Sequence, residues 1–597
     1  MEKLMTPRGE ALAGTPWDVY PRPQMKREQW WNLNGQWEFG IHYDRKIRVP
    51  FCPESELSGI GEHFPEGSPL RYRRTVTLPS GSGRWLLHFG AADQRAQVYI
   101  NGKLAGEHAG GYTAFTLDVT DLWQEGENEI KVICRDDLTD RSFPYGKQTL
   151  TRGGMWYTPV SGIWQTVWME PVDACGLERA QVLTDIDQNQ VIVHPTFCNE
   201  GAATLTVTMS DGKKVVATKT VPAQNNSTIV LPVKKARLWS PADPFLYTLS
   251  YEVKDEAGKC IDQVSSYVGM RKIHVKGNKV YLNNEPFYQR LVLDQGFYPD
   301  GIWTAPSDEA LRHDIELSMQ AGFNGARLHQ KVFEERFHYW ADKLGYITWG
   351  EAPSWGMDAN NPEVARNFIT EWSEEIIRDR NHPSIVTWTP MNEEWWPDRV
   401  QFPRFVSDVY DLTKALDPTR PVCDVSGGVH VKTDIWTTHN YEQDPKKLQD
   451  IVFNGQRWFQ TPNYTLSFPQ RNVGFNRHTD NNLYDFPTYD KPDMPYLIDE
   501  VGGIKWVKGQ DAQTGNDQNK SWGYGEPPHS LEEFYARLEG QIDALMEISE
   551  NVWGYCYTQL TDVEQEQNGI YFYDRTSKFD MKRIHAIFSK KPASSKH

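Results

Sequence analysis

The sequence predicts two β-sandwiches followed by a (β/α)8 TIM barrel, and three observations support this prediction. Short strand-like runs separated by turn signals fill the chain up to about residue 270. Beyond about residue 275, strand-like runs alternate with helical patterns, as βα units require. Eight such runs follow, and eight strands close a barrel of this kind. We therefore expect a multidomain chain with its helices in the second half.

Residues 1–172 are predicted to form a jelly-roll sandwich. Asn101-Gly102 is its clearest hairpin turn, and the flanking strand-like runs are RYRRTVTL, RWLLHFG, AQVYI and NEIKVIC. Residues 173–270 repeat this pattern more compactly and predict an immunoglobulin-like sandwich, with the runs QVIVHPTFC, ATLTVTMS, STIVLPV and FLYTLSYEV. The barrel is then expected to occupy residues 271–597.

Within the barrel, helical periodicity and end signals locate the first helices. One helix is predicted to begin after Ser307 as N-cap and to end at Gly322. A second apolar stripe runs from Phe333 to Leu344 and ends at Gly345. The eight candidate strands are FYQRLVL, FNGARL, GYITWG, SIVTWTP, PVCDVS, DIWTTHNY, MPYLID and VWGYCYTQL.

The charge balance and the cysteines exclude several classes of partner. With 63 Lys and Arg against 80 Asp and Glu, the net charge of −17 disfavours nucleic acid and anionic membranes. The N-terminal MEKLMTPRGE lacks an apolar segment, and no run approaches the roughly 20 apolar residues of a membrane span. Seven cysteines without a CxxC pair indicate reduced thiols. We expect a cytoplasmic protein, and assembly into a homo-oligomer is left open.

Aromatic residues are the outlier of the composition. The chain has 23 Trp, 27 Tyr and 25 Phe, which together make 13% of its residues. Aromatic rings stack on the apolar faces of sugars, but they also concentrate in cores and interfaces. Until the rings are placed, both interpretations stand.

Two adjacent acids lie in an apolar and aromatic stretch, TWTPMNEEWWPD. Glu393 and Glu394 are surrounded there by tryptophan, proline and methionine. Desolvation in such surroundings raises the pKa of a carboxyl group and lets it hold a proton near neutral pH. The alternative is a strand end followed by two ordinary loop acids.

A second acidic pair indicates a function for the first. Glu393 comes just after the fourth predicted barrel strand, and Asp499-Glu500 in YLIDEVGG ends the seventh. Chemistry in such barrels gathers at the carboxyl ends of the strands, so both pairs are expected at one mouth. Two opposed carboxyl groups, one protonated and one ionised, are what glycoside hydrolysis requires.

At this point the chain resembles glycoside hydrolase family 2, the β-galactosidase and β-glucuronidase group. The resemblance is carried by the two acid motifs and by YPRPQMKREQWWNLNGQWEF, GFNGARLHQ and NGIYFYDR. It implies the same order of jelly-roll, immunoglobulin-like and barrel domains. It also implies that Glu393 is the acid/base and Glu500 the nucleophile of a retaining mechanism that uses neither metal nor cofactor. Glu394 and Asp499 are then neighbours of the catalytic pair.

Further residues at the predicted mouth are candidates for substrate binding, and each has a packing or turn role as its alternative. Asn392 is expected to donate to the sugar 2-hydroxyl. By resemblance, Arg327 braces the nucleophile with Glu351 orienting it, and a tyrosine, here Tyr441, lies near the nucleophile. Relatives commonly carry a histidine motif where this chain has Asp294. The full set is Asn392, Arg327, His329, Glu351, His439, Tyr441, Asp140 and Asp294.

Asp140 differs from the others because it belongs to the predicted jelly-roll. It lies in DDLTDRSFPYG and resembles a loop acid of the family that reaches the barrel mouth and grips sugar hydroxyls. An ordinary loop acid is the alternative.

The sugar is predicted by elimination. Glucuronidases of the family carry an Asn-x-Lys triplet beside the strand-eight loop, whereas this region reads EQEQNGIYFYDR and has no such lysine. We therefore predict a retaining exo-glycosidase that hydrolyses terminal β-D-galactosides. A β-glucuronidase stays open because Arg457, Arg471 or Arg477 could supply a cation. An α-L-arabinopyranosidase stays open because its glycone shares the galactoside ring stereochemistry.

A function of another class is a non-catalytic carbohydrate-binding protein that keeps the scaffold, since a fold does not guarantee activity. The presence of both acids argues against it. Hydrolysis of any aryl glycoside would exclude it.

Overall fold

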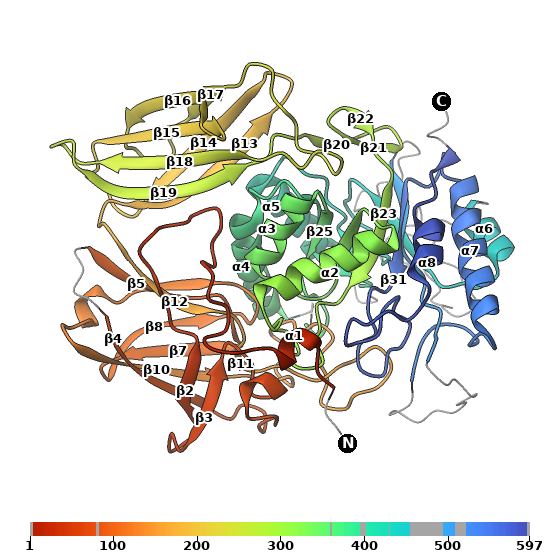
Figure 1. Cartoon of the computed structure of the whole chain (residues 1–597), viewed down its shortest axis with the longest axis horizontal. Helices are drawn as coiled ribbons and strands as arrows, with labels where there is room; N and C mark the ends of the chain where they lie inside the picture. Colours follow the sequence, from red (N-terminus) through yellow and green to blue (C-terminus); the bar gives the residue numbers. More distant parts are fainter. Residues whose placement is uncertain are drawn as a thin grey trace.

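The computed structural model describes residues 4–78, 83–358, 361–394, 401–428, 430–453, 494–507 and 521–593. Figure 1 shows two β-sandwiches stacked on one side of the molecule and a barrel with its helices on the other. The predicted fold class is confirmed, while the exact limits of the three domains stay predictions. Arg457, Arg471 and Arg477, the alternative cations named above, lie outside the described residues.

The first sandwich packs a four-stranded sheet against a six-stranded one. The order of the first sheet is β1 (Trp31–Asn32), β12 (Val167–Val172), β5 (Arg84–Phe89) and β9 (Phe115–Asp118). The order of the second is β3 (Arg45–Val49), β2 (Gly35–Phe39), β4 (Leu70–Thr77), β10 (Glu127–Arg135), β7 (Arg95–Ile100) and β8 (Lys103–Ala109). Alternate residues of β10 are buried, so one face of each strand fills the core between the sheets. A short pair, β6 (Ala92–Asp93) and β11 (Gly162–Ile163), lies beside them.

The second sandwich is smaller and also antiparallel. One sheet has the order β13 (Leu177–Asp185), β14 (Gln190–Phe197) and β17 (Ile229–Pro232). The other has the order β16 (Lys214–Pro222), β15 (Thr204–Asp211), β18 (Tyr247–Lys254) and β19 (Cys260–Val268). Tyr267 of β19 reaches the barrel, where its hydroxyl donates to Asp342 at 2.8 Å.

All eight predicted barrel strands form. Seven make one parallel sheet in the order β26 (Ile385–Thr389), β25 (Ile347–Glu351), β24 (Gly325–Leu328), β23 (Gln289–Asp294), β31 (Gly554–Thr558), β30 (Tyr496–Gly502) and β29 (Trp436–Asn440). The fifth predicted strand is reduced to β28 (Val425–Ser426), which pairs with β27 (Met391–Asn392) just beyond β26. A parallel bridge from Trp388 to Val422 continues that connection. The strands are buried on both faces, which explains their continuous apolar runs.

Helices cover the outside of this sheet, and the first follows the sequence signals. α2 (Asp308–Ala321) begins after Ser307 and ends at Gly322, whose φ of 104° is the left-handed conformation that glycine adopts readily. The remaining helices of the barrel region are α3 (Glu335–Leu344), α4 (Pro362–Asp379), α5 (Gln401–Leu416), α6 (Pro445–Phe453), α7 (Leu531–Glu547) and α8 (Met581–Phe588). Among the described residues, none of the helices is long and apolar enough to span a membrane.

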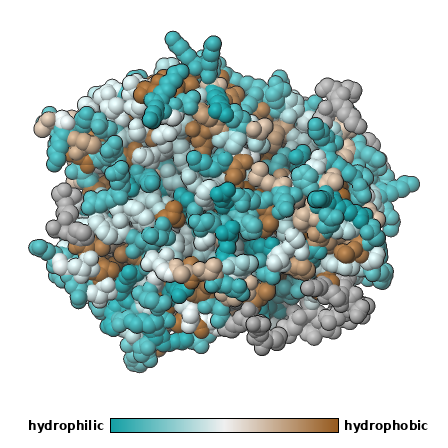
Figure 2. Space-filling view, viewed as in Figure 1, coloured by the Kyte–Doolittle hydropathy of each residue, from teal (hydrophilic) through white to brown (hydrophobic). Residues whose placement is uncertain are grey.

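Most of the large aromatic side chains serve the cores. The tryptophans among the largest fully buried side chains are Trp37, Trp164, Trp168, Trp239, Trp303, Trp349, Trp372 and Trp388. On the face shown in Figure 2, apolar residues are scattered between polar ones. Packing therefore accounts for much of the aromatic excess, and among the described rings those near the barrel mouth are the candidates for sugar stacking.

Candidate active site

The carboxyl ends of the barrel strands bring the predicted acids and their neighbours together. Glu500 lies in β30, and Glu393 follows β27 directly. Arg327 belongs to β24, Glu351 ends β25 and His439 lies in β29. All five come from different strands, and we call them the mouth cluster.

Glu500 is buried and held from two sides. A guanidinium nitrogen of Arg327 donates to one of its carboxylate oxygens, and the Tyr441 hydroxyl donates to the other. Burial acts to raise the pKa of Glu500, but the charges of His439 and Arg327 outweigh burial and lower it to about 2. The side chain is therefore an oriented carboxylate at neutral pH, with one oxygen fixed by each partner.

His439 lies between the two acids. Its Nδ1 is 2.5 Å from Glu393 Oε1 and 3.4 Å from Glu500 Oε2. Its Nε2 is 3.3 Å from Asp499 Oδ1. Burial disfavours the charged ring, but these carboxylates, Glu500 foremost, raise the pKa of His439 to about 10. The ring is an imidazolium near neutral pH and compensates the negative charge of the paired acids.

Glu393 and Glu394 point to different surroundings, although they are adjacent. Glu393 has φ of 47°, and its N–H donates to the Ser426 carbonyl oxygen at 2.8 Å. One carboxylate oxygen of Glu393, one of Glu500 and a ring nitrogen of His439 lie within 4.8 Å of one another. Burial raises the pKa of Glu394 to about 8, with a hydrogen bond to Ser354 acting against this. Of the two acids, Glu393 is the one that faces Glu500.

Arg327 connects the mouth cluster to Asn392. Its side chain is fully buried, and one guanidinium nitrogen contacts Glu351 and, at 3.0 Å, the Asn392 Oδ1. Burial raises the pKa of Glu351 to about 7 in spite of the Arg327 charge. His329 Nδ1 lies 2.8 Å from Glu351 Oε1, and burial holds the pKa of His329 well below its usual range. The neutral imidazole and the partly ionised acid complete one hydrogen-bonded network.

Asn392 presents an amide donor that nothing in the described part of the chain satisfies. Its Nδ2 is buried and has no hydrogen-bond partner there. The Trp355 indole donates to its carbonyl oxygen at 2.9 Å, and its N–H donates to the Ser354 hydroxyl at 3.1 Å. The orientation of Asn392 is thus fixed from three sides, and its free N–H groups are suited to a sugar hydroxyl.

Among the described contacts, the side chains of two predicted binding residues do not reach the mouth cluster. The contacts of Asp140 are with Arg95, at 3.4 Å, and with Ser142, all within the first sandwich. Asp294 ends β23, and its carboxylate accepts from the Gly296 N–H at 2.9 Å. Burial and the nearby Asp314 raise the pKa of Asp294 to about 6. Neither acid contacts Glu393 or Glu500 through its described partners, so a substrate-binding role for them stays a prediction.

Several neighbours of the cluster were not predicted from the sequence. Tyr524 stacks on Tyr441 with ring centres 3.4 Å apart. Trp355 and Trp156 are half-buried with ring centres 5.0 Å apart, and they come from the barrel and the first sandwich respectively. The ammonium group of Lys147, from the first sandwich, lies 5.4 Å from the ring centre of Trp355. The only available sequence signal was the aromatic content, which does not distinguish mouth rings from core rings.

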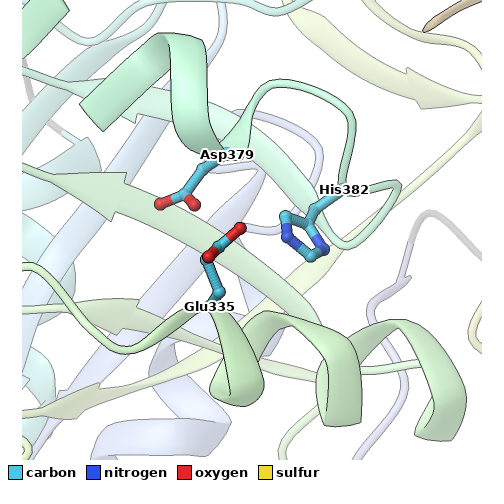
Figure 3. A group of neighbouring side chains, drawn as sticks. All are labelled: Glu335, Asp379 and His382. Carbon is cyan, nitrogen blue, oxygen red and sulfur yellow. The ribbon is translucent and has the colours of Figure 1, made fainter. Parts of the chain in front are cut away.

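Two groups of acids and histidines among the described residues have the spacing of metal ligands. One is Glu393, His439 and Glu500, where the protonated ring already supplies positive charge. The other is Glu335, Asp379 and His382, which point toward one another in Figure 3.

The second group has its own counter-charge. Arg378 donates two hydrogen bonds to Asp379, at 2.7 and 2.6 Å, and His382 Nδ1 lies 2.6 Å from Asp342. Because an arginine occupies both oxygens of the central acid, we assign no metal to this group.

Three family models match the chain in the order of its domains. The glycosyl hydrolase 2 galactose-binding domain-like model matches residues 42–143, and the glycosyl hydrolases family 2 model matches 176–271. The TIM barrel domain model of glycosyl hydrolases family 2 matches residues 273–467. Together they cover both sandwiches and much of the barrel.

Similar proteins carry two different activity names. A β-glucuronidase of Paenibacillus borealis is 27% identical over 68% of this chain and 74% of that protein. A putative β-glucuronidase of Formosa agariphila is 28% identical over 59% of this chain, and the match spans only 44% of that protein. A β-galactosidase of Thermoanaerobacter pseudethanolicus is 25% identical over 63% of this chain and 50% of that protein.

Solved structures agree on the fold. The β-glucuronidase from Ruminococcus gnavus in complex with D-glucuronic acid covers 96% of this chain and 100% of its own, with a TM-score of 0.75 and 18% identity. The β-D-glucuronidase of Dictyoglomus thermophilum covers 96% and 99%, with a TM-score of 0.75 and 20% identity. The family models, the relatives and the shared architecture agree that the chain belongs to glycosyl hydrolase family 2.

Proposed function

We propose that this chain is a retaining β-glycosidase that releases a terminal sugar by double displacement. The observation that carries the proposal is the approach of a Glu393 and a Glu500 oxygen to within 4.8 Å. Retaining glycosidases need carboxyl groups about 5–5.5 Å apart, whereas inverting ones need about 6.5–9.5 Å to admit a water. The short separation supports direct attack by one of the two groups.

The electrostatics support a division of roles between them. Glu500, whose pKa is lowered to about 2, is ionised and oriented for attack on the anomeric carbon. Glu393 then protonates the departing oxygen and afterwards deprotonates the water that releases the sugar. His439 contacts both acids, so its positive charge lies between them in the free enzyme.

Asn392 is the proposed donor to the sugar 2-hydroxyl. Its Nδ2, which has no partner among the residues that the structure describes, and its hydrogen bond from Arg327 support this role. A hydrogen bond at that hydroxyl strengthens as the ring flattens and so lowers the barrier.

The identity of the glycone is the second part of the proposal, and the sequence predicts β-D-galactose. That prediction rests on the missing lysine of the strand-eight loop, and the similar proteins include both β-galactosidases and β-glucuronidases. A panel of nitrophenyl glycosides comprising galactoside, glucuronide, arabinopyranoside, glucoside and mannoside is the direct test. We expect turnover of at least one member and, by proton NMR, a first-formed sugar of retained anomeric configuration. Inversion would overturn the assignment of Glu500 as nucleophile, and no turnover of any member would contradict the glycosidase activity.

A further inference from the structure

A loop of the first sandwich crosses to the barrel mouth and carries Lys147 with it. The loop connects β10 to β11, and its N–H groups at Tyr145 and Gly146 donate to the Trp355 carbonyl oxygen at 2.9 and 3.1 Å. Gly146 has φ of 61°, and a Cβ there would lie 2.5 Å from the Gln330 carbonyl oxygen. The loop is therefore packed directly against the segments that follow β24 and β25.

Lys147 is buried, yet its ammonium group has no acceptor in the described part of the chain. The residue is 5% exposed, and Nζ lies 5.4 Å from the ring centre of Trp355 and 5.7 Å from that of Tyr157. Among the residues described by the structure, none accepts a hydrogen bond from this Nζ or forms an ion pair with it. The charge of Lys147 acts on Glu566, where it opposes the rise in pKa that burial causes, but no described carboxylate lies within ion-pair distance of the ammonium. A buried ammonium without an ion-pair partner favours an anion.

The charge of Lys147 acts on the mouth cluster. Burial is the main reason for the low pKa of His329, and the nearby Lys147 charge adds to it. For Glu500, where burial acts in the opposite direction, Lys147 joins His439 and Arg327 in lowering the pKa. The ammonium is thus close to the nucleophile without forming an ion pair with it.

Neighbouring cations are already engaged. Arg327 is paired with Glu351 and Glu500, and Lys331 donates to the carbonyl oxygens of Gly296 and Trp303 at 2.9 and 2.6 Å. The segment after β31 presents the carboxylate of Glu566 instead, which accepts from the Tyr157 hydroxyl. Lys147 is therefore a described cation near the mouth that lacks an acceptor and is suited to an anionic group of the substrate.

We propose that Lys147 binds the carboxylate of a hexuronic acid glycone, which makes β-D-hexuronides the substrate class of this site. The inference rests on the proposed function and reverses the order of glycones predicted from the sequence. In a uronide, a carboxylate replaces the exocyclic CH₂OH, and one ammonium matches one carboxylate. A neutral glycone would leave that ammonium unpaired and bind less well.

Matched pairs of substrates test the proposal. Nitrophenyl β-D-glucuronide is compared with the β-D-glucoside, and the β-D-galacturonide with the β-D-galactoside, because each pair differs only at the carboxylate. The wild type is expected to favour the uronide in at least one pair. Lys147→Gln is expected to lower kcat/KM for that uronide by roughly 10- to 100-fold, the range of a charge-assisted hydrogen bond, and that for the neutral partner by less than about 3-fold.

Two controls separate specificity from structure. Lys147→Arg keeps the positive charge and should retain more of the uronide preference than Lys147→Gln. Arg141→Gln removes a cation from an exposed position of the same loop and should leave both members of each pair unchanged. Equal losses on the uronide and on the neutral glycoside in Lys147→Gln, or a wild type that prefers neutral glycosides, would overturn the proposal.

Binding distinguishes a failure of this inference from a failure of the proposed function. Calorimetric titration with D-glucuronate against D-glucose, and with D-galacturonate against D-galactose, needs no turnover. If the wild type hydrolyses no glycoside but binds one uronate more tightly than its neutral sugar, and Lys147→Gln loses that difference, the carboxylate site is supported and the glycosidase activity is refuted. If the wild type hydrolyses neutral glycosides and binds neither uronate in preference to its neutral sugar, the glycosidase activity is supported and the carboxylate site is refuted.

Discussion

The mouth cluster and the helix cluster, which we define as Glu335, Asp379 and His382, both combine acids with a histidine but differ in how their acids are held. In the helix cluster, Arg378 holds both oxygens of Asp379, and α3 contributes His338 to the same acid at 3.5 Å. In the mouth cluster, two acids, Glu393 and Glu500, face each other across His439. An unpartnered buried nitrogen does not separate the clusters, since Asn392 Nδ2 beside the mouth and His382 Nε2 in the helix cluster both lack a partner among the described residues. Buried charge alone therefore does not identify an active site.

The positions of the two clusters on the fold explain the difference. Glu335 begins α3 and Asp379 ends α4, so the helix cluster fixes how two helices pack beside the barrel. The mouth cluster comes from the ends of strands, where the fold leaves space for a ligand. Substitutions should accordingly affect stability in the first cluster and turnover in the second.

The largest expected effect concerns the catalytic acids of the mouth cluster. Glu393→Ala should slow glycosides with poor leaving groups roughly 10²- to 10⁴-fold but activated aryl glycosides far less, because a weakly basic phenolate departs without a proton. Azide, which needs no base, should restore turnover and give a glycosyl azide of retained configuration. Glu500→Gln should lose at least as much activity and should not form that product.

Glu394→Ala is the matched control for this experiment, since it removes the adjacent acid that does not face Glu500. If azide rescues Glu394→Ala and leaves Glu393→Ala inactive, the roles of the two neighbours are exchanged.

Sequence patterns were sufficient for the scaffold and for the acids, because strand ends have a fixed place in a barrel. Glu393, Glu500, Arg327 and His439 were expected at one mouth for that reason, and they lie there. Lys147 was not predicted, because its position depends on how a loop of one domain packs against another. No local periodicity encodes that packing.

The protonation states at the mouth could not be predicted from the sequence either. The sequence placed His439 at a strand end, but not between two acids, where its pKa rises to about 10. The sequence predicted desolvation for the acidic pair, and in the structure burial raises the pKa of Glu394 to about 8. Both properties follow from side-chain directions, which a strand assignment alone does not give.

A change in the helix cluster should produce the opposite result from a change at the mouth. Asp379→Asn keeps the shape but leaves the Arg378 charge without its buried partner, which typically costs about 3–5 kcal/mol of unfolding free energy. We expect a lower urea midpoint and a kcat within about 3-fold of the wild type. Asp408→Asn, which removes an exposed pair with Arg404, should leave the midpoint unchanged. A stable Asp379→Asn variant with strongly reduced turnover would contradict the assignment of a structural role to the helix cluster.

The smallest expected effect concerns pH and tests whether His439 keeps Glu500 ionised. In the wild type, the Glu500 pKa of about 2 means that its protonation limits activity only in strong acid. His439→Asn removes a positive charge, so the Glu500 pKa should rise, typically by about one to three units, and the acid limb of kcat/KM should move to higher pH. The readout is the position of the limb, since the substitution also removes a contact with Glu393 and lowers the overall rate.

Tyr441→Phe removes a hydrogen bond to Glu500 but no charge, so its limb should move less. An acid limb that stays in place in His439→Asn would show that Arg327 suffices to keep the nucleophile ionised.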